Sequence, residues 1–291
     1  MWILRIIYFF VFILISGLIS GCNRVSPSST KRVITLTPSL TETVCRFQKH
    51  SSYQIVATDK YSTDSCVQTL PKLDTEGSLE NIIALKPDLV LMHSSQSIMA
   101  EKLKKLNIEV GMYDMDTIPK IQQAWREIAQ ILEVPEEAEI LLKEVSKQRS
   151  ATVEHSMRTQ ETSPSILIIV DRLDARMQQF YTATPPAYLA DIVKDCGFNI
   201  QTTPLDSASG WTRMESETLI SLNPSDILYL ARNHEDAKNF EEQFIKQYAM
   251  LDAVKTHHLF VYDDPQITIP GPNLFTQQSK LCQFLRSPVD Y

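Results

Sequence analysis

Two spacings of apolar residues alternate along the first half of the chain. Short unbroken apolar runs have the length of β-strands, and the segments between them carry apolar residues at helical spacing. Strands that alternate with helices predict a parallel sheet with helices on both of its faces. The strands are predicted at 33–36, 53–58, 88–92 and 108–113, and the helices at 79–86, 97–106 and 118–133.

A longer helical segment begins at Pro135-Glu136-Glu137. Proline fits the first turn of a helix, and acidic residues there suit the helix dipole. Neither glycine nor proline occurs from Ala138 to Glu161, and about 26 residues at 1.5 Å each give a length of roughly 39 Å. Apolar residues become sparse after Val145, which predicts one narrow packed stripe and much exposure to solvent. The segment is therefore predicted to be a strut between two halves of the protein.

The strand and helix pattern starts again after Ser163-Pro164. The predicted fold is α/β, with two lobes, each a mainly parallel sheet covered by helices, joined by one long rigid α-helix. The lobes are predicted at 32–134 and 162–291, with the connecting helix at 135–161. The second lobe has predicted strands at 166–170, 180–183, 226–230 and 258–262, and predicted helices at 186–196, 236–247 and 273–286.

An internal repeat supports the two lobes. LENIIALKPDLVLM at 79–92 matches SETLISLNPSDILYL at 216–230 in the order of acidic, apolar, proline, aspartate and strand residues. One copy falls on each side of the predicted long helix, and Glu80 and Glu217 occupy equivalent positions. The alternative is a helix–turn–strand unit of the general kind that recurs in α/β proteins.

The first 21 residues differ from the rest of the chain. They contain one charged residue, Arg5, in an apolar run that ends in small residues, which is typical of a signal peptide. Ile19-Ser20-Gly21-Cys22 resembles the bacterial lipobox, in which the cysteine is lipidated and becomes the new N-terminus. Residues 22–31 are then a lipid-anchored flexible tether, and the protein faces the periplasm or the cell exterior. The alternative is an uncleaved transmembrane anchor, because the run approaches spanning length.

Charge, composition and the absence of several sequence motifs disfavour three classes of protein. The chain of 291 residues has a net charge of −7, which disfavours nucleic-acid binding. Its seven glycines form no phosphate-binding loop, and it has no G-x-S-x-G, H-E-x-x-H or C-x-x-C motif, so an enzyme is disfavoured. The six histidines include no helical i, i+4 pair, which disfavours direct binding of Zn²⁺ or Mn²⁺.

Four cysteines remain after the predicted lipidation site. An even number in an exported protein predicts two disulfides, and three pairings are possible. The pairing of Cys45 with Cys66 and of Cys196 with Cys282 is preferred, because it keeps each bridge inside one half of the chain. The alternative is that the cysteines are free buried thiols.

Several stretches together resemble the helical-backbone (class III) substrate-binding proteins of ABC importers. This resemblance covers about residues 30–286 and is closest to the branch that binds vitamin B12. The stretch YTATPPAYLADIVKDCGF at 181–198 carries the likeness to that branch, and it also supports the pairing of Cys196 with Cys282. The other matching stretches are RVITLTPSLTE at 32–42, GSLENIIALKPDLVLM at 77–92, the helix after 135, GWTRMESETLISLNPSDILYL at 210–230, and the last helix with Cys282.

The resemblance implies a function in transport. Members of this family capture an iron–siderophore, haem or vitamin B12 in a cleft between two lobes and deliver it to a permease and its ATPase. A corrinoid is the favoured ligand, a haem or ferric siderophore is the alternative, and the protein is expected to act as a monomer with no resident cofactor. Two positions depart from the B12-binding branch, which has tryptophan where His93 falls and again near Thr75.

Candidate ligand residues lie where predicted strands end, because ligands of open α/β sheets bind beyond the carboxyl ends of strands. Trp211 follows Gly210 in an apparent polar loop and is expected to be a platform for a flat ligand, the alternative being packing over that loop. Arg172 either pairs with an anionic group of the ligand or is a solvated charge. His93 donates to the ligand, coordinates its metal, or only closes the strand. The predicted ligand-binding residues are Ser39, Tyr61, His93, Arg172, Tyr181 and Trp211.

Glu80 and Glu217 are each expected in the first turn of a helix, one in each lobe. Acidic residues stabilise that position through the helix dipole, which is sufficient to explain them. The resemblance adds that such paired acids dock with arginines of the permease. A stiff helix between the lobes permits only a small closure, so the cleft is expected to be largely preformed.

Overall fold

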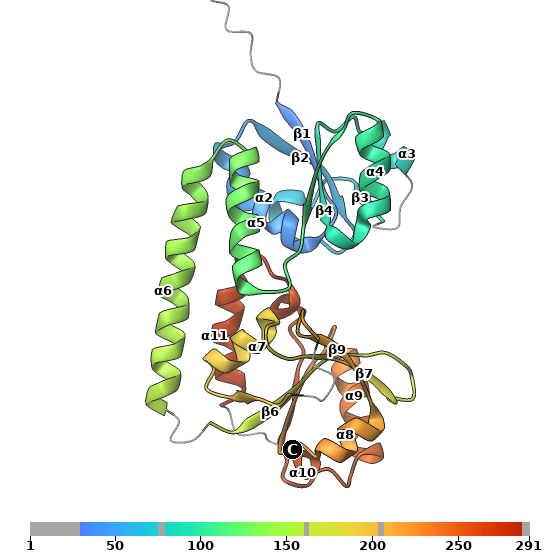
Figure 1. Ribbon diagram of the computed structural model, residues 1–291, viewed down its shortest axis with the longest axis vertical. Coiled ribbons are helices and arrows are strands. Elements are labelled where there is room, and N and C mark those ends of the chain that lie inside the picture. The colour runs from blue at the N-terminus through green and yellow to red at the C-terminus, as the bar shows by residue number, and fades with distance from the viewer. Residues whose placement is uncertain (1–29, 75–78, 160–162, 203–206, 287–291) are drawn as a thin grey trace, which may run out of the picture. The chain divides into compact units, whose positions relative to one another are not determined.

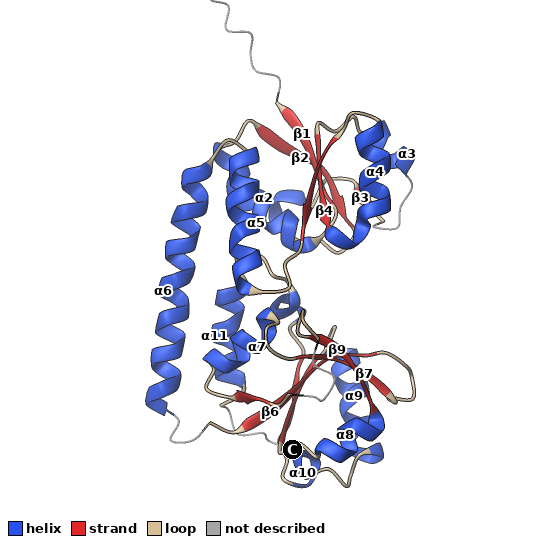
Figure 2. Ribbon diagram, viewed as in Figure 1, coloured by secondary structure: helices blue, strands red, loops and turns tan. Residues whose placement is uncertain are grey.

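The computed structural model describes residues 30–74, 79–159, 163–202 and 207–286, and the chain divides into two units, 1–30 and 31–291. The predicted signal peptide, Cys22 and nearly all of the predicted tether lie outside the described residues. The second unit contains two sheets, each flanked by helices on both sides (Figures 1 and 2).

The sheet of the N-terminal lobe is entirely parallel, as predicted. Its strand order is β3-β2-β1-β4-β5, so the carboxyl ends of all five strands meet at one edge. Successive residues of β1 point to opposite faces, with Val33 in one apolar cluster and Ile34 in another. Both faces are therefore buried under helices. The strands are β1 Lys31–Thr35, β2 Tyr53–Asp59, β3 Lys72–Leu73, β4 Leu89–His93 and β5 Glu109–Tyr113.

The sheet of the C-terminal lobe is mixed. Three pairings are parallel, β6 with β8, β6 with β10, and β10 with β11, while β7 pairs antiparallel with both β6 and β9. The expectation that Trp211 lies in a loop is wrong, because Trp211 is the first residue of β9. The strands are β6 Ser165–Arg172, β7 Gln179–Ala183, β8 Asn199–Ile200, β9 Trp211–Glu215, β10 Asp226–Leu230 and β11 Leu259–Tyr262.

Helices α2 and α5 pack on one face of the first sheet, and α3 and α4 lie at its other side (Figure 1). In the second lobe α7 and α11 share a cluster with one face of β6, and α9 shares a cluster with the other face. The helices are α2 Pro38–Phe47, α3 Leu79–Ala84, α4 Ser97–Lys105, α5 Ile118–Ile131, α6 Pro135–Thr159, α7 Tyr188–Asp195, α8 Ser216–Leu222, α9 His234–Gln247, α10 Asp252–Lys255 and α11 Leu274–Phe284; short 3₁₀ turns are Gln48–His50, Ser65–Val67, Ser94–Gln96 and Pro265–Thr268.

One apolar cluster runs through both lobes. It joins residues of β1, α2 and α5 to residues of β6, α7 and α11, with the first half of α6 between them. Trp125 on α5 and Phe275 on α11 are both fully or nearly fully buried in this cluster. Because a packed interior resists shearing and the loss of its contacts, this shared core restricts how far the lobes can move apart.

Helix α6 is the predicted strut. It extends beside both lobes and contacts α5, α7 and α11 (Figure 1). Leu141 and Val145 are buried, whereas the buried residues further along are polar, Thr152 and Ser156. The apolar stripe thus ends after Val145, as the sequence predicted. Further along, α6 contacts α11 through a hydrogen bond, with the hydroxyl groups of Thr152 and Ser279 3.3 Å apart.

Both predicted disulfides are present. Cys45 of α2 is bonded to Cys66, with 6.1 Å between their Cα atoms. Cys196 follows α7 and is bonded to Cys282 of α11, with 5.0 Å between their Cα atoms. The second bridge joins two helices that both belong to the core shared by the lobes.

The repeated segment forms the same unit in each lobe, α3–β4 and α8–β10. The residue before each proline has positive φ, 47° at Lys86 and 40° at Asn223. A left-handed residue ends the helix, and the proline after it prevents the helix from continuing. Glu80 and Glu217 are exposed in the first turns of α3 and α8.

A buried carboxyl group forms a polar contact between the lobes. Glu42 of α2 accepts a hydrogen bond from the backbone N–H of Asn273, just before α11. A Cβ atom at Gly271 would lie 2.2 Å from Oε2 of Glu42, so only glycine permits this approach. Burial chiefly, with a smaller effect of Asp64, raises the pKa of Glu42 to about 7.

The two disulfides are expected to differ in their contribution to stability. The Cys45–Cys66 bridge spans 21 residues and the Cys196–Cys282 bridge spans 86. Loop-closure entropy predicts losses of about 3 and about 4.5 kcal/mol when the bridges are removed. Urea unfolding of two paired alanine variants, one for each bridge, measures the difference. A larger loss for the 45–66 pair would contradict the prediction.

Glu42→Gln is expected to change the pH dependence of stability. Unfolded Glu42 ionises near pH 4.5 and folded Glu42 near pH 7, so the folded protein binds the extra proton in this window. Stability contributed by Glu42 is complete below about pH 4.5 and is lost as the pH rises through about 7. The free energy of unfolding of Glu42→Gln relative to wild type should therefore rise by up to about 3 kcal/mol between pH 4.5 and 8.

Urea titrations at both pH values measure this change, and Glu109→Gln, at an exposed residue of β5, is the control. A constant difference between Glu42→Gln and wild type would contradict the prediction.

Candidate functional site: a cleft between the two sheets

A cavity of about 280 Å³ lies between the polar ends of the two sheets. The first lobe contributes the end of β4 and the segment that follows β5. The second lobe contributes β6, β7, β9, the start of α7 and the segment before α11. The lining residues are His93, Met115, Asp116, Val170, Tyr181, Tyr188, Leu189, Trp211, Thr268 and Pro270.

Three aromatic side chains form one wall of the cavity. Tyr181 of β7 and Trp211 of β9 stack with ring centroids 6.0 Å apart and an angle of 12° between the planes. The ring of Tyr188 is tilted against Trp211 at 5.5 Å. The antiparallel register explains the stack, because Ala183 lies opposite Trp211, so Tyr181 is its diagonal neighbour on the same face.

The polar atoms of this wall differ in their hydrogen-bond partners. Burial, and secondarily the negative charge of Asp116, raises the pKa of both Tyr181 and Tyr188, so both hydroxyls are neutral at physiological pH. The Tyr188 hydroxyl donates to the carbonyl oxygen of Thr268 at 2.8 Å. The indole N–H of Trp211 is buried and has no hydrogen-bond partner among the described residues. An unmade hydrogen bond of this kind is costly unless a ligand or water completes it.

His93 is the last residue of β4 and lines the same cavity. Its Nδ1 accepts a hydrogen bond from the backbone N–H of Ser95 at 3.2 Å, and the side chain of Gln96 accepts from the backbone N–H of His93. The Oγ of Ser95 lies 2.8 Å from the same Nδ1 and can either donate to it or accept from it, so the tautomer of the ring depends on that hydroxyl. Each of the three roles considered for His93 stays a prediction.

Three predicted ligand residues, His93, Tyr181 and Trp211, are brought together in the cavity, and Ser39 and Tyr61 are not among the residues that line it. Ser39 is 8% exposed within α2, and its hydroxyl lies 3.2 Å from that of Thr37. Tyr61 is 62% exposed beyond β2, with the ammonium group of Lys60 over its ring. A role of Ser39 and Tyr61 in ligand binding stays a prediction.

Arg172 also lies outside the lining of this cavity. Its Nη2 donates to Oδ1 of Asp236 at 3.0 Å, and Asp236 is 6% exposed and also accepts from Arg232 and Tyr229. Arg172 and Arg232 line a separate pocket of about 360 Å³. The sequence offered no sign of this arrangement, because Asp236 lies 64 residues further along the chain. Binding of a ligand by Arg172 stays a prediction.

Two acidic residues of the cleft region were missed. Asp114 and Asp116 directly follow β5, at the same edge as His93, and Asp116 lines the cavity. Burial alone would raise the pKa of Asp114, but hydrogen bonds from Lys120 and from the Asp116 amide lower it. Burial, followed by the negative charge of Asp114, raises the pKa of Asp116. Their position at the end of a predicted strand was the available signal.

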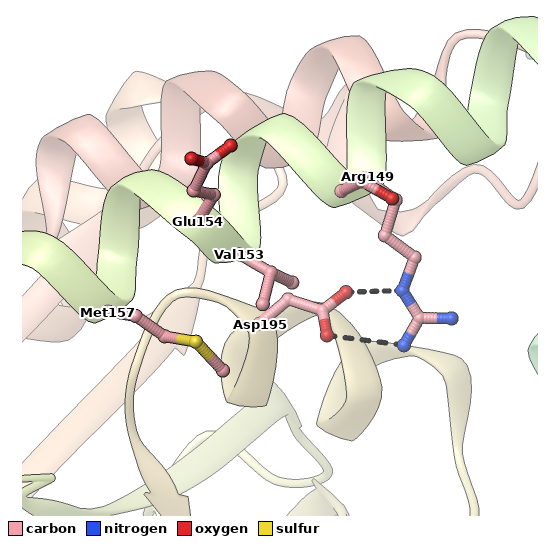
Figure 3. Close-up of a pocket in the computed structure, with 6 residues that line it drawn as sticks. Arg149, Val153, Glu154, Met157 and Asp195 are labelled. Carbon is pink, nitrogen blue, oxygen red and sulfur yellow. Dashed lines mark hydrogen bonds and ion pairs between the residues drawn. The ribbon is translucent and has the colours of Figure 1, made fainter.

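A further pocket of about 540 Å³ lies beside α6, where polar side chains join neighbouring helices (Figure 3). Arg149 of α6 donates through Nε and Nη2 to the two carboxylate oxygens of Asp195, at 2.5 and 3.2 Å. Asp195 also accepts from Gln278 of α11 at 2.9 Å. These bonds tie α6, α7 and α11 together, so the charged groups of this pocket already have partners.

The described residues include no group of three or more His, Cys, Asp or Glu side chains placed to hold a metal ion. Among the helices of the same residues, none combines the length and the apolar character that crossing a membrane requires.

The sequence profile of a family described as periplasmic binding protein matches residues 33–266. The chain belongs to this family. The match includes both sheets and all of α6, and the expected resemblance to helical-backbone (class III) ABC substrate-binding proteins is confirmed. The family is one of substrate-binding proteins and is not an enzyme class.

Individual relatives agree with this assignment. An uncharacterised ABC-transporter substrate-binding lipoprotein of Bacillus subtilis (strain 168) is 25% identical over 264 residues, 87% of this chain and 79% of that protein. The structure of the S. aureus protein IsdE complexed with haem has a TM-score of 0.73 at 20% identity, covering 88% of this chain and 99% of that one. A vitamin B12-binding protein of Vibrio cholerae has a TM-score of 0.65 at 17% identity, covering 89% and 97%. At these identities the likeness to solved structures establishes the fold alone.

Proposed function

We propose that this periplasmic binding protein captures a metal chelate in the cleft between its lobes and delivers it to the permease and ATPase of an ABC importer. A corrinoid such as vitamin B12 is the favoured ligand. The same proposal places the mature protein outside the cytoplasm as a monomer, anchored by a lipid on Cys22. The name of the Bacillus subtilis relative, a lipoprotein, supports the anchor.

The aromatic wall is the observation that carries this proposal. Tyr181 and Trp211 present two nearly parallel rings to the cavity. Flat faces of this kind bind the broad apolar face of a macrocycle, while a few polar groups bind its edge. The imidazole of His93 and the hydroxyl of Tyr181, both of which line the cavity, supply such groups.

The favoured metal chelate is held by its edge and its face rather than by a bond from the protein to its metal. Among the described residues that line the cavity, His93 is the only imidazole, and its Nδ1 is engaged by the backbone N–H of Ser95. A corrinoid brings its own equatorial ligands and many peripheral amides, which suits this arrangement. Haem or a ferric siderophore is the second candidate, because solved proteins of this fold include haem-binding members.

Delivery is proposed to use Glu80 and Glu217. Each is exposed in the first turn of its helix, and each helix is followed by the same left-handed residue and proline. Two equivalent acidic positions, one in each lobe, fit a partner that presents a cationic side chain to each lobe.

Titration of the purified mature chain with cobalamin, haem and ferric siderophores tests the ligand. Trp211 lines the cavity and Trp125 is fully buried in the core, so ligand binding should change the fluorescence of Trp211 more than that of Trp125. Trp125→Phe should keep most of the signal, and Trp211→Phe should lose most of it. Micromolar or tighter binding of cobalamin is expected. Comparable binding of a siderophore with none of cobalamin would overturn the corrinoid assignment.

Charge reversal at both proposed docking residues should stop transport without affecting capture. The double variant Glu80→Lys with Glu217→Lys is expected to lose most uptake in vesicles containing the permease and ATPase, because like charges then meet across the contact. Its affinity for ligand in solution should stay within about twofold of wild type, since both residues lie outside the cavity lining.

The matched control is Glu136→Lys with Glu235→Lys, which reverses two exposed acids in the first turns of α6 and α9. Equal loss of uptake in both double variants, or loss of ligand binding in the first, would count against docking.

A further inference from the structure

Asp116 lines the cavity together with the aromatic wall, although it belongs to the first lobe and the wall to the second. Its backbone carbonyl oxygen accepts a hydrogen bond from the N–H of Tyr188 at 2.8 Å. That bond joins the segment after β5 to the start of α7. Asp116 is therefore held at the junction of the two lobes rather than on a free loop.

The charges around Asp116 leave its carboxyl group without a cationic partner. Lys120 bonds to Asp114 instead, and its Nζ lies 2.5 Å from Oδ2 of that residue. The backbone N–H of Asp116 also donates to Asp114, at 3.0 Å. Among the described residues Asp116 forms no ion pair, although Lys120 and then His93 favour its ionised form through their charges. Because Lys120 is bonded to Asp114, the carboxyl group of Asp116 is the acid of this pair that lines the cleft without a cation bonded to it.

We infer that Asp116 is a specificity-determining residue that selects ligands presenting an N–H donor, such as a peripheral amide, and disfavours ligands presenting a carboxylate at this part of the cleft. The inference rests on the proposed function and narrows the class of chelate. An amide donates to the Asp116 carboxyl oxygen, whereas a carboxylate at the same place meets an acidic group and cannot donate.

Burial gives this selection its strength. Asp116 is half-buried, and burial together with Asp114 already raises its pKa, which is the effect that a second anion would increase. Bringing a ligand carboxylate beside it would displace water from both groups, and the nearby ammonium group of Lys120 is already bonded to Asp114.

Matched ligands that differ in one peripheral group test the inference. Wild-type protein is titrated with cobalamin and with its monocarboxylic acid derivatives, in each of which one amide has been hydrolysed. Wild type should bind cobalamin about tenfold more tightly than at least one of these derivatives, as expected for one hydrogen bond to a charged group. In Asp116→Asn this ratio should fall toward one, because the amide side chain accepts and donates equally.

Asp116→Ser is the second variant, and it should show the same loss of discrimination if Asp116→Asn folds poorly. The control is Glu109→Gln, which removes the same charge from an exposed residue at the opposite end of β5 and should keep the wild-type ratio. Unchanged discrimination in both Asp116 variants would overturn the inference and leave the proposed function intact.

Binding of haem would test the role of Asp116 separately from the corrinoid assignment. If wild type binds haem and not cobalamin, the corrinoid assignment fails, and the same comparison is made with haem and its dimethyl ester. Tighter binding of the ester by wild type, lost in Asp116→Asn, would support the role of Asp116. Tighter binding of the free dicarboxylate would overturn it.

Discussion

The apolar core shared by the two lobes is the constraint on which the cleft depends. Residues of both sheets meet in one cluster through α5, α6, α7 and α11, so the distance between the polar edges of the sheets is set by packing. Glu42 adds a polar contact at the same boundary, where its carboxyl group reaches the chain just before α11. Close-packed interiors tolerate little rearrangement, which is the reason to expect a largely preformed cavity.

The two lobes contribute different kinds of side chain to the cleft, and different strand arrangements place them there. In the first lobe all five strands are parallel, so His93 and the acids after β5 arrive together at one edge. In the second lobe the antiparallel strands β7 and β9 place Tyr181 and Trp211 as diagonal neighbours. The first lobe therefore provides hydrogen-bonding groups, and the second provides flat apolar faces. A ligand with a broad face and a polar edge uses both.

Periodic, local features of the fold could be predicted from the sequence. The apolar run ending at His93, the helix without glycine or proline after Pro135, and the repeated unit were all placed correctly because each depends on near neighbours. The pairing of the four cysteines was also confirmed.

Features that depend on distant partners could not be predicted. β9 is short, and its strand character comes from pairing with β7 about 30 residues earlier, so Trp211 was placed in a loop. Arg172 was expected in the cleft, but its partner Asp236 is brought to it by the fold. Asp114 and Asp116 follow a predicted strand, which was a signal in the sequence, but only residues of the second lobe make Asp116 part of a cavity.

Helix α6 joins the lobes without a glycine or proline in its interior, so it has no point at which it can fold over. Any force that separates the lobes must bend this helix along its length, and a bent helix opposes the force and recovers when the force ends. We therefore expect the lobes to part by elastic bending of α6 rather than by rotation about a hinge. Parting the lobes requires work from outside, and in the proposed function that work falls to the importer.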